Sequence, residues 1–76
     1  MTNDQTAAYM AFENADRAWH AAIVAAFPKR WPGDVRYQPE GMGSPGTALR
    51  AAYDEFHRTR VVWDEARTAG MVTIYI

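Results

Sequence analysis

Residues 44–70 read S-P-G-T-A-L-R-A-A-Y-D-E-F-H-R-T-R-V-V-W-D-E-A-R-T-A-G and carry the clearest structural signal in the chain. Ser44 is suited to the N-cap of a helix, because its hydroxyl can accept a hydrogen bond from a free backbone N–H group. Pro45 suits the first helical position, where its missing N–H costs nothing, and Gly70 suits the left-handed position that ends a helix. We therefore expect a helix over residues 45–69.

One side of this helix carries a stripe of residues at alternating spacings of three and four, the pattern of a closely packed helix pair. The stripe comprises Leu49, Ala52, Phe56, Thr59, Trp63 and Ala66. Its predicted partner is a helix over residues 4–27, in which large apolar residues alternate with alanines on one face. In an antiparallel pair we expect Trp19 to lie near Phe56 and Phe12 to lie near Trp63.

Two short segments have the pattern of strands. Residues 34–38 alternate polar and apolar side chains between turn residues, and residues 71–76 form a β-branched, alternating run. Two strands alone are marginally stable, so we expect them either to pair in a βαβ unit or to pair with another subunit. The sequence therefore predicts a mostly helical α+β fold, in which an antiparallel two-helix hairpin and two short strands follow the order α-β-α-β and dimerisation completes the structure.

The length and composition predict one small domain, residues 1–76, that associates with a partner. A domain of this size buries only roughly 60% of its unfolded surface. No cysteine is present to form a disulfide, yet 49% of the residues are hydrophobic. This is more apolar surface than one small core can hide, so we expect a homodimer or a protein partner. The expected interface residues lie off the helix stripe or in the last segment: Met10, Val24, Val61, Val62, Val72, Ile74 and Ile76.

The absence of cysteine and of any secretory or membrane-spanning pattern predicts a cytoplasmic protein without a membrane partner. One lysine beside seven arginines, with many alanines, suggests a GC-rich bacterial genome. No stretch matches a specific catalytic, metal or nucleotide signature, so we predict no catalytic residue, no metal ligand set and no cofactor. The primary hypothesis is a small non-catalytic interaction or regulatory module that acts through protein–protein association.

Polar residues flank the predicted helix seam and suggest one alternative, a small metal- or ligand-binding protein. Histidines and carboxylates on facing helices are how helix bundles build metal and acid–base sites. Arginines among the carboxylates favour an ion-pair network instead, because they neutralise the oxygens that a metal needs. We prefer the network. The flank comprises Glu13, Asp16, His20, Tyr53, His57, Arg60 and Asp64, with Tyr9 and Arg67 beside them.

A second alternative is nucleic-acid binding through residues 29–37. Cations lie beside aromatic rings in this segment, which could provide phosphate contacts and base stacking. The candidate residues are Lys29, Arg30, Trp31 and Arg36. Asp34 and Glu40 dilute the patch, and the formal net charge of −1 gives the chain no overall attraction for phosphates. Nucleic acid is therefore not the favoured partner.

Overall fold

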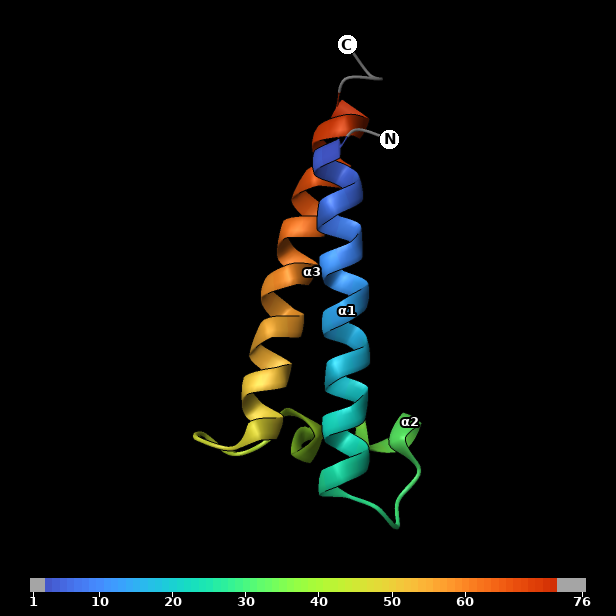
Figure 1. Ribbon diagram of the computed structural model, residues 1–76, viewed down its shortest axis with the longest axis vertical. Coiled ribbons are helices and arrows are strands. Elements are labelled where there is room, and N and C mark those ends of the chain that lie inside the picture. The colour runs from blue at the N-terminus through green and yellow to red at the C-terminus, as the bar shows by residue number, and fades with distance from the viewer. Residues whose placement is uncertain (1–2, 73–76) are drawn as a thin grey trace.

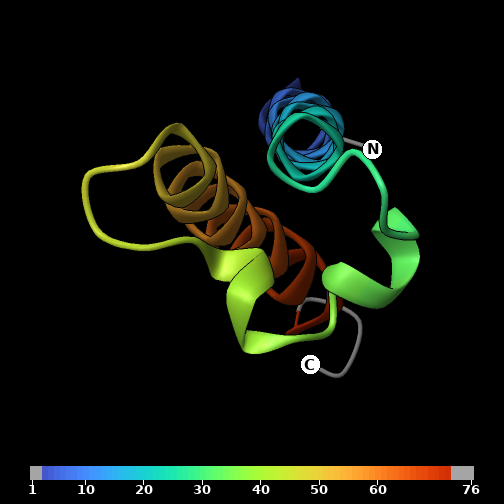
Figure 2. The ribbon, with the colours of Figure 1, turned by 90° about the horizontal axis from the view of Figure 1, so that it is seen from below.

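The computed structural model describes residues 3–72, which form two long helices joined by a connector with two short helical turns (Figure 1). Helix α1 spans Asn3–Ala26 and α3 spans Ala48–Val72. In the connector, α2 spans Pro32–Val35 and the 3-10 turn η1 spans Pro39–Met42. The connector lies to one side of the helix pair when the hairpin is viewed from its closed end (Figure 2).

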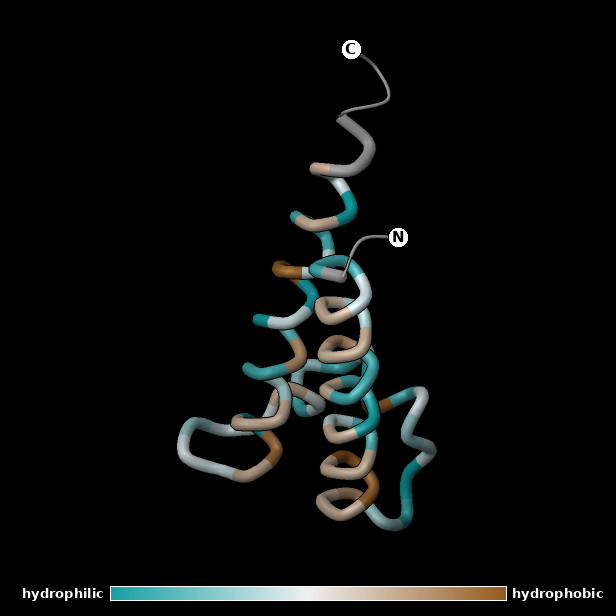
Figure 3. Tube along the Cα trace, turned by 45° about the horizontal axis from the view of Figure 1, so that its top comes forward, coloured by the Kyte–Doolittle hydropathy of each residue, from teal (hydrophilic) through white to brown (hydrophobic). Residues whose placement is uncertain are grey.

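Helices α1 and α3 run antiparallel, as the stripes on their sequences predict. Near the open end, the side chain of Gln5 donates a hydrogen bond to the carbonyl of Ala66 at 3.3 Å. Hydrophobic and hydrophilic residues alternate along both helices, turn after turn (Figure 3). The hydrophobic side chains buried between the two helices and the connector are Ala8, Ala15, Trp19, Ile23, Val35, Leu49 and Phe56.

The contacts between the helices confirm one predicted pairing and replace another. The ring centroids of Trp19 and Phe56 are 4.7 Å apart, as the antiparallel stripes predict. Phe12 also packs on Phe56, at 5.5 Å, while Trp63 packs on Tyr9 at 5.1 Å. Among the described residues no ring contact joins Phe12 to Trp63, so that predicted contact is displaced by about one helical turn.

The predicted α+β fold is wrong, because residues 3–72 contain helices and turns but no strand. The first predicted strand, residues 34–38, is the end of α2 and the turn that follows it. Trp31 has an extended backbone and precedes Pro32, which starts α2 at the position where a missing N–H is harmless. Val35 is completely buried and anchors this turn against the helices. A single buried apolar residue holds the segment, and no ladder of strand hydrogen bonds is needed.

The second predicted strand, residues 71–76, begins inside a helix. Helix α3 continues through Gly70 to Val72, so Gly70 does not end it. Residues 73–76 lie outside the described part of the chain. The helical hydrogen bonds of α3 therefore outweigh both the modest helix penalty of one glycine and the β-branched pattern at the start of this segment.

The start of α3 is also three residues later than predicted. Ser44 and Pro45 do not cap the helix but form a turn, in which the N–H of Thr47 donates to the carbonyl of Ser44 at 3.1 Å. Gly46 has φ of 87°, a left-handed conformation that cannot belong to the helix. Thr47 is the cap, because its side-chain oxygen accepts a hydrogen bond from the N–H of Arg50 at 3.2 Å.

No helix in the range from residue 3 to residue 72 combines the length and the apolar character needed to cross a membrane.

Candidate functional site

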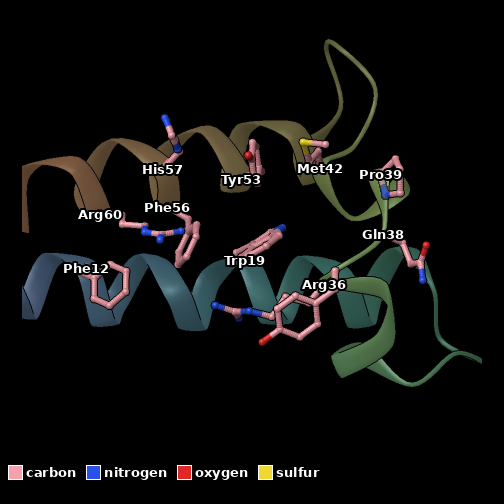
Figure 4. A pocket seen from close by; sticks show the side chains of 11 residues that line it. Phe12, Trp19, Arg36, Gln38, Pro39, Met42, Tyr53, Phe56, His57 and Arg60 are labelled. Atoms are coloured by element: carbon pink, nitrogen blue, oxygen red, sulfur yellow. The ribbon is translucent and has the colours of Figure 1, made fainter. Parts of the chain in front are cut away.

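A groove of about 630 Å³ opens where the connector meets the two helices, on one side of the hairpin (Figure 4). Helix α1 contributes two of its lining residues, the connector five and α3 four. They are Phe12, Trp19, Arg36, Tyr37, Gln38, Pro39, Met42, Tyr53, Phe56, His57 and Arg60. The set contains two arginines and a histidine but no aspartate or glutamate. The groove is therefore aromatic and cationic within a chain whose formal net charge is −1.

Trp19 is the centre of the groove floor, where the rings of Phe12, Phe56 and Trp19 form a row between the helices (Figure 4). Its indole N–H donates a buried hydrogen bond of 2.9 Å to the carbonyl of Gly41 in η1. The ring of Tyr53 meets Trp19 edge-on, with 5.3 Å between centroids. Hydrogen bonding and ring packing thus fix the orientation of Trp19, so the floor is preformed.

Arg36 lies across this floor and is held from two directions. Its guanidinium carbon is 4.6 Å from the centroid of Trp19 and 5.2 Å from that of Phe56, which are cation–π distances. A guanidinium nitrogen also forms an ion pair with Asp16 on α1. The fully buried Val35 immediately before it anchors the backbone. Arg36 is therefore a positioned part of the groove wall.

Arg60 is the cation at the far end of the groove, and its ion pair is weak. Its Nε lies 3.9 Å from a carboxylate oxygen of Asp64, while Arg67 approaches the other oxygen at 2.9 Å. Asp64 is thus shared with a better-placed arginine, and the side chain of Arg60 is 61% exposed. His57 stacks on Tyr53 one turn away, with 6.3 Å between ring centroids. Arg60 is therefore available to an anionic group in the groove.

The connector forms the closed end of the groove because Gly41 allows it to approach its own chain. A Cβ atom at this position would lie 2.2 Å from the carbonyl oxygen of Val35, which is too close for any side chain. Gly41 is also buried, and its carbonyl accepts the Trp19 hydrogen bond. This close approach sets the position of the segment that contributes Gln38, Pro39 and Met42 to the wall.

The predicted polar flank divides into groove residues and local ion pairs. Tyr53, His57 and Arg60 line the groove, and Asp16 reaches it through Arg36. Asp64 pairs within α3, as described above. His20 is exposed and is not among the groove-lining residues. The expected meeting of carboxylates and histidines across the seam therefore does not occur: in residues 3–72 no ion pair joins α1 to α3.

Glu13 is also engaged within its own helix. It accepts a hydrogen bond of 2.7 Å from the hydroxyl of Tyr9, which raises the pKa of Tyr9, and it lies 3.5 Å from Arg17. Across the described range, no group of three or more histidine, aspartate or glutamate side chains is placed to hold a metal ion. The geometry of the flank thus gives no support to the metal-binding alternative.

The predicted nucleic-acid patch is also divided. Arg36 lies in the groove, and Arg30 forms an ion pair of 2.9 Å with Glu40, a contact that lowers the pKa of Glu40. Lys29 and Trp31 are exposed, the latter by 73%. Arg30 and Arg36 are both paired to carboxylates, which weakens the attraction of the segment for phosphates.

The four predicted interface residues whose side chains the structure describes do not form one patch. Met10 and Val24 lie about 160° and 120° around α1 from Phe12, on the side away from α3. Val61 and Val62 lie about 140° and 120° from Phe56 in opposite senses around α3. All four are exposed, by 42% to 57%. The side chain of Val72 and residues Ile74 and Ile76 lie outside what the structure describes.

Sequence reasoning missed the connector's contribution to the groove. The sequence pattern predicts a strand over residues 34–38, which include Tyr37 and Gln38, and it gives no indication that Pro39 and Met42 line a groove. The available signal was the pair Pro39 and Gly41, since proline starts a helical turn readily and glycine permits close backbone approach. The aromatic floor was recognised only as core packing.

No protein-family model, curated protein or solved structure matched the chain when it was compared with each.

Proposed function

We propose that the protein is a small non-catalytic binding module whose groove takes an anionic ligand with an apolar body. The observation that carries the proposal is the composition of the groove. Aromatic rings form its floor, Arg36, His57 and Arg60 lie around it, and no carboxylate lines it. Preformed grooves that combine apolar walls with a few convergent polar groups are the usual form of ligand sites.

The apolar floor and the cations have different roles in this proposal. Covering about 100 Å² of apolar surface contributes roughly 2.5 kcal/mol. An ion pair with an exposed arginine such as Arg60 contributes up to about 1 kcal/mol. Affinity is therefore supplied mainly by the floor, whereas Arg60 distinguishes anionic ligands from neutral ones of the same shape.

A pair of fluorescent dyes tests the proposal. The anionic dye is 8-anilinonaphthalene-1-sulfonate, and the neutral dye N-phenyl-1-naphthylamine has the same ring system without the sulfonate. We expect saturable binding of the anionic dye, weakened about threefold to fivefold by Arg60→Met, the loss of roughly 1 kcal/mol. Binding of the neutral dye should change by less than twofold, because it makes no ion pair.

Arg58→Met is the matched control, since Arg58 is on the same helix, is paired with Glu55 and does not line the groove. Circular dichroism of each variant establishes that the helices are intact. Equal binding of both dyes, or an equal loss of binding in the Arg58 and Arg60 variants, would contradict the proposal.

A further inference from the structure

The connector already covers part of the hairpin face that holds the groove. Val35 is completely buried, Arg36 lies over the rings of Trp19 and Phe56, and the carbonyl of Gly41 accepts a hydrogen bond from the indole. This side of the α1–α3 pair therefore already packs against another segment of the protein. The connector covers this face at the closed end of the hairpin (Figure 1).

The remaining part of the same face has an aromatic floor and no cover in the described chain. Phe12 packs on Phe56 here, and the contact between Tyr9 and Trp63 continues the row of rings towards the open end. Tyr9 is 38% exposed. Two antiparallel helices leave a seam between them, and a third helix packs naturally into such a seam.

The groove residues on α3 are spaced like the contacts that a helix makes when it lies in a groove. Tyr53, His57 and Arg60 follow one another at intervals of four and three, so they lie along one edge of the seam over two turns, roughly 10 Å. An amphipathic helix that lies in a groove makes its contacts at the same intervals. This edge of the groove therefore accommodates about two turns of such a helix.

The charged side chains around the groove indicate where a helix bound there would carry an acidic residue. Arg60 shares Asp64 with Arg67 and keeps a 61% exposed side chain, and His57 lies one turn from it on the same edge. On the α1 side, Glu13 is engaged by Tyr9 and Arg17, and Asp16 by Arg36. On the α3 side, the guanidinium of Arg60 is thus available to a carboxylate from outside.

From these contacts, and resting on the function proposed above, we infer that the natural occupant of the groove is an amphipathic helix of a partner protein. One large apolar side chain of this helix covers Phe12 and Phe56. An aspartate or glutamate one turn away forms an ion pair with Arg60. The protein and its partner segment together make a three-helix unit in which the connector abuts the end of the third helix.

Selection from a displayed peptide library tests the inference. The library presents 16-residue helices on an alanine- and glutamine-based scaffold, with four positions on one face, spaced three and four apart, fully randomised. The full-length protein is the bait, and bound peptides are eluted with 8-anilinonaphthalene-1-sulfonate. We expect enriched peptides to combine a large apolar residue with aspartate or glutamate three or four positions away.

A charge exchange then identifies the contact. For a synthetic enriched peptide, replacing its acidic residue by glutamine should weaken binding threefold or more, and Arg60→Glu should weaken it tenfold or more. The peptide with lysine at the acidic position should bind the Arg60→Glu variant better than it binds the wild type. Arg58→Glu should leave all affinities within twofold, because Arg58 does not line the groove.

The dye and the peptides separate this inference from the function on which it rests. If the anionic dye binds at Arg60 but no helix is enriched, or enriched peptides are indifferent to Arg60→Glu, the helix inference is overturned and the ligand groove stands. If the dye and the peptides both fail to bind a folded protein, both proposals fall.

Discussion

Gly41→Ala is the substitution that most directly probes how the connector is held against the helices. The added Cβ would lie 2.2 Å from the carbonyl oxygen of Val35 and 3.1 Å from its carbonyl carbon, and both atoms belong to the backbone. Neither can rotate away. The turn η1 must therefore shift by roughly 1 Å to restore an ordinary contact of more than 3 Å.

This shift has a calculable cost because the Gly41 carbonyl accepts the indole hydrogen bond of Trp19 at 2.9 Å in a buried environment. Leaving a buried polar group unsatisfied costs about 1–3 kcal/mol. Distortion of the tightly packed turn adds about 1–3 kcal/mol, as in other overpacked sites. We expect the free energy of unfolding to fall by roughly 2–6 kcal/mol, a large part of the stability of a small domain.

Urea denaturation followed by circular dichroism measures this change, with Gly33→Ala as the control. At Gly33 the new Cβ meets the side chain of Trp31, whose ring is 73% exposed and free to move, so the expected cost is below about 1 kcal/mol. Trp19→Phe removes the same hydrogen bond from the other side. The double variant Gly41→Ala/Trp19→Phe should therefore be less destabilised than the sum of the single variants. A Gly41→Ala protein within about 0.5 kcal/mol of the wild type, which is close to the limit of the measurement, would refute this account of the connector.

Three further predictions concern the caps, the pH dependence and the assembly. Thr47→Ala should lower the free energy of unfolding by about 1 kcal/mol in the same urea assay, because Thr47 caps α3, whereas a Ser44→Ala effect as large would contradict that assignment. The ion pair with Arg30 lowers the pKa of Glu40 from 4.5, so its stabilising contribution is present above that pH and disappears as the pH falls through the lowered value. The difference in melting temperature between the wild type and Glu40→Gln should accordingly shrink below pH 4.5, and a difference that grows on acidification would be inconsistent with the pair. Light scattering coupled to size-exclusion chromatography should report about twice the 8.6 kDa chain mass if the predicted homodimer forms, and a monomer at micromolar concentration would exclude it.

Helix periodicity was sufficient to predict the two long helices, their antiparallel direction and the contact between Trp19 and Phe56. These features depend on residues three and four apart, which the sequence displays directly. It also placed Tyr53, His57 and Arg60 on one edge of the second helix, and this edge lines the groove. Half of the site was thus predictable from local pattern.

The other half depends on contacts between distant residues. Residues 34–38 alternate like a strand, but Val35 is drawn into the core between the helices, and this burial determines the conformation of the segment. The groove wall is fixed by a hydrogen bond between Trp19 and Gly41, 22 positions apart. The short-range sequence pattern does not predict such a hydrogen bond. The late start of α3 has a local cause, because Pro45 and the left-handed Gly46 form a turn and Thr47 immediately after it caps the helix.

The length of the connector affects which amino-acid substitutions the protein can accept during evolution. Antiparallel helices in bundles are usually joined by 2–8 residues, whereas residues 27–47, a segment of 21, separate α1 from α3. Most of this extra chain is not required to turn the corner, and it supplies the closed end of the groove. Substitutions of Tyr37, Gln38, Pro39 or Met42 can therefore alter what the groove accepts, while Gly41 and the paired helices maintain the fold. Specificity and stability are in this way assigned to different residues of a 76-residue chain.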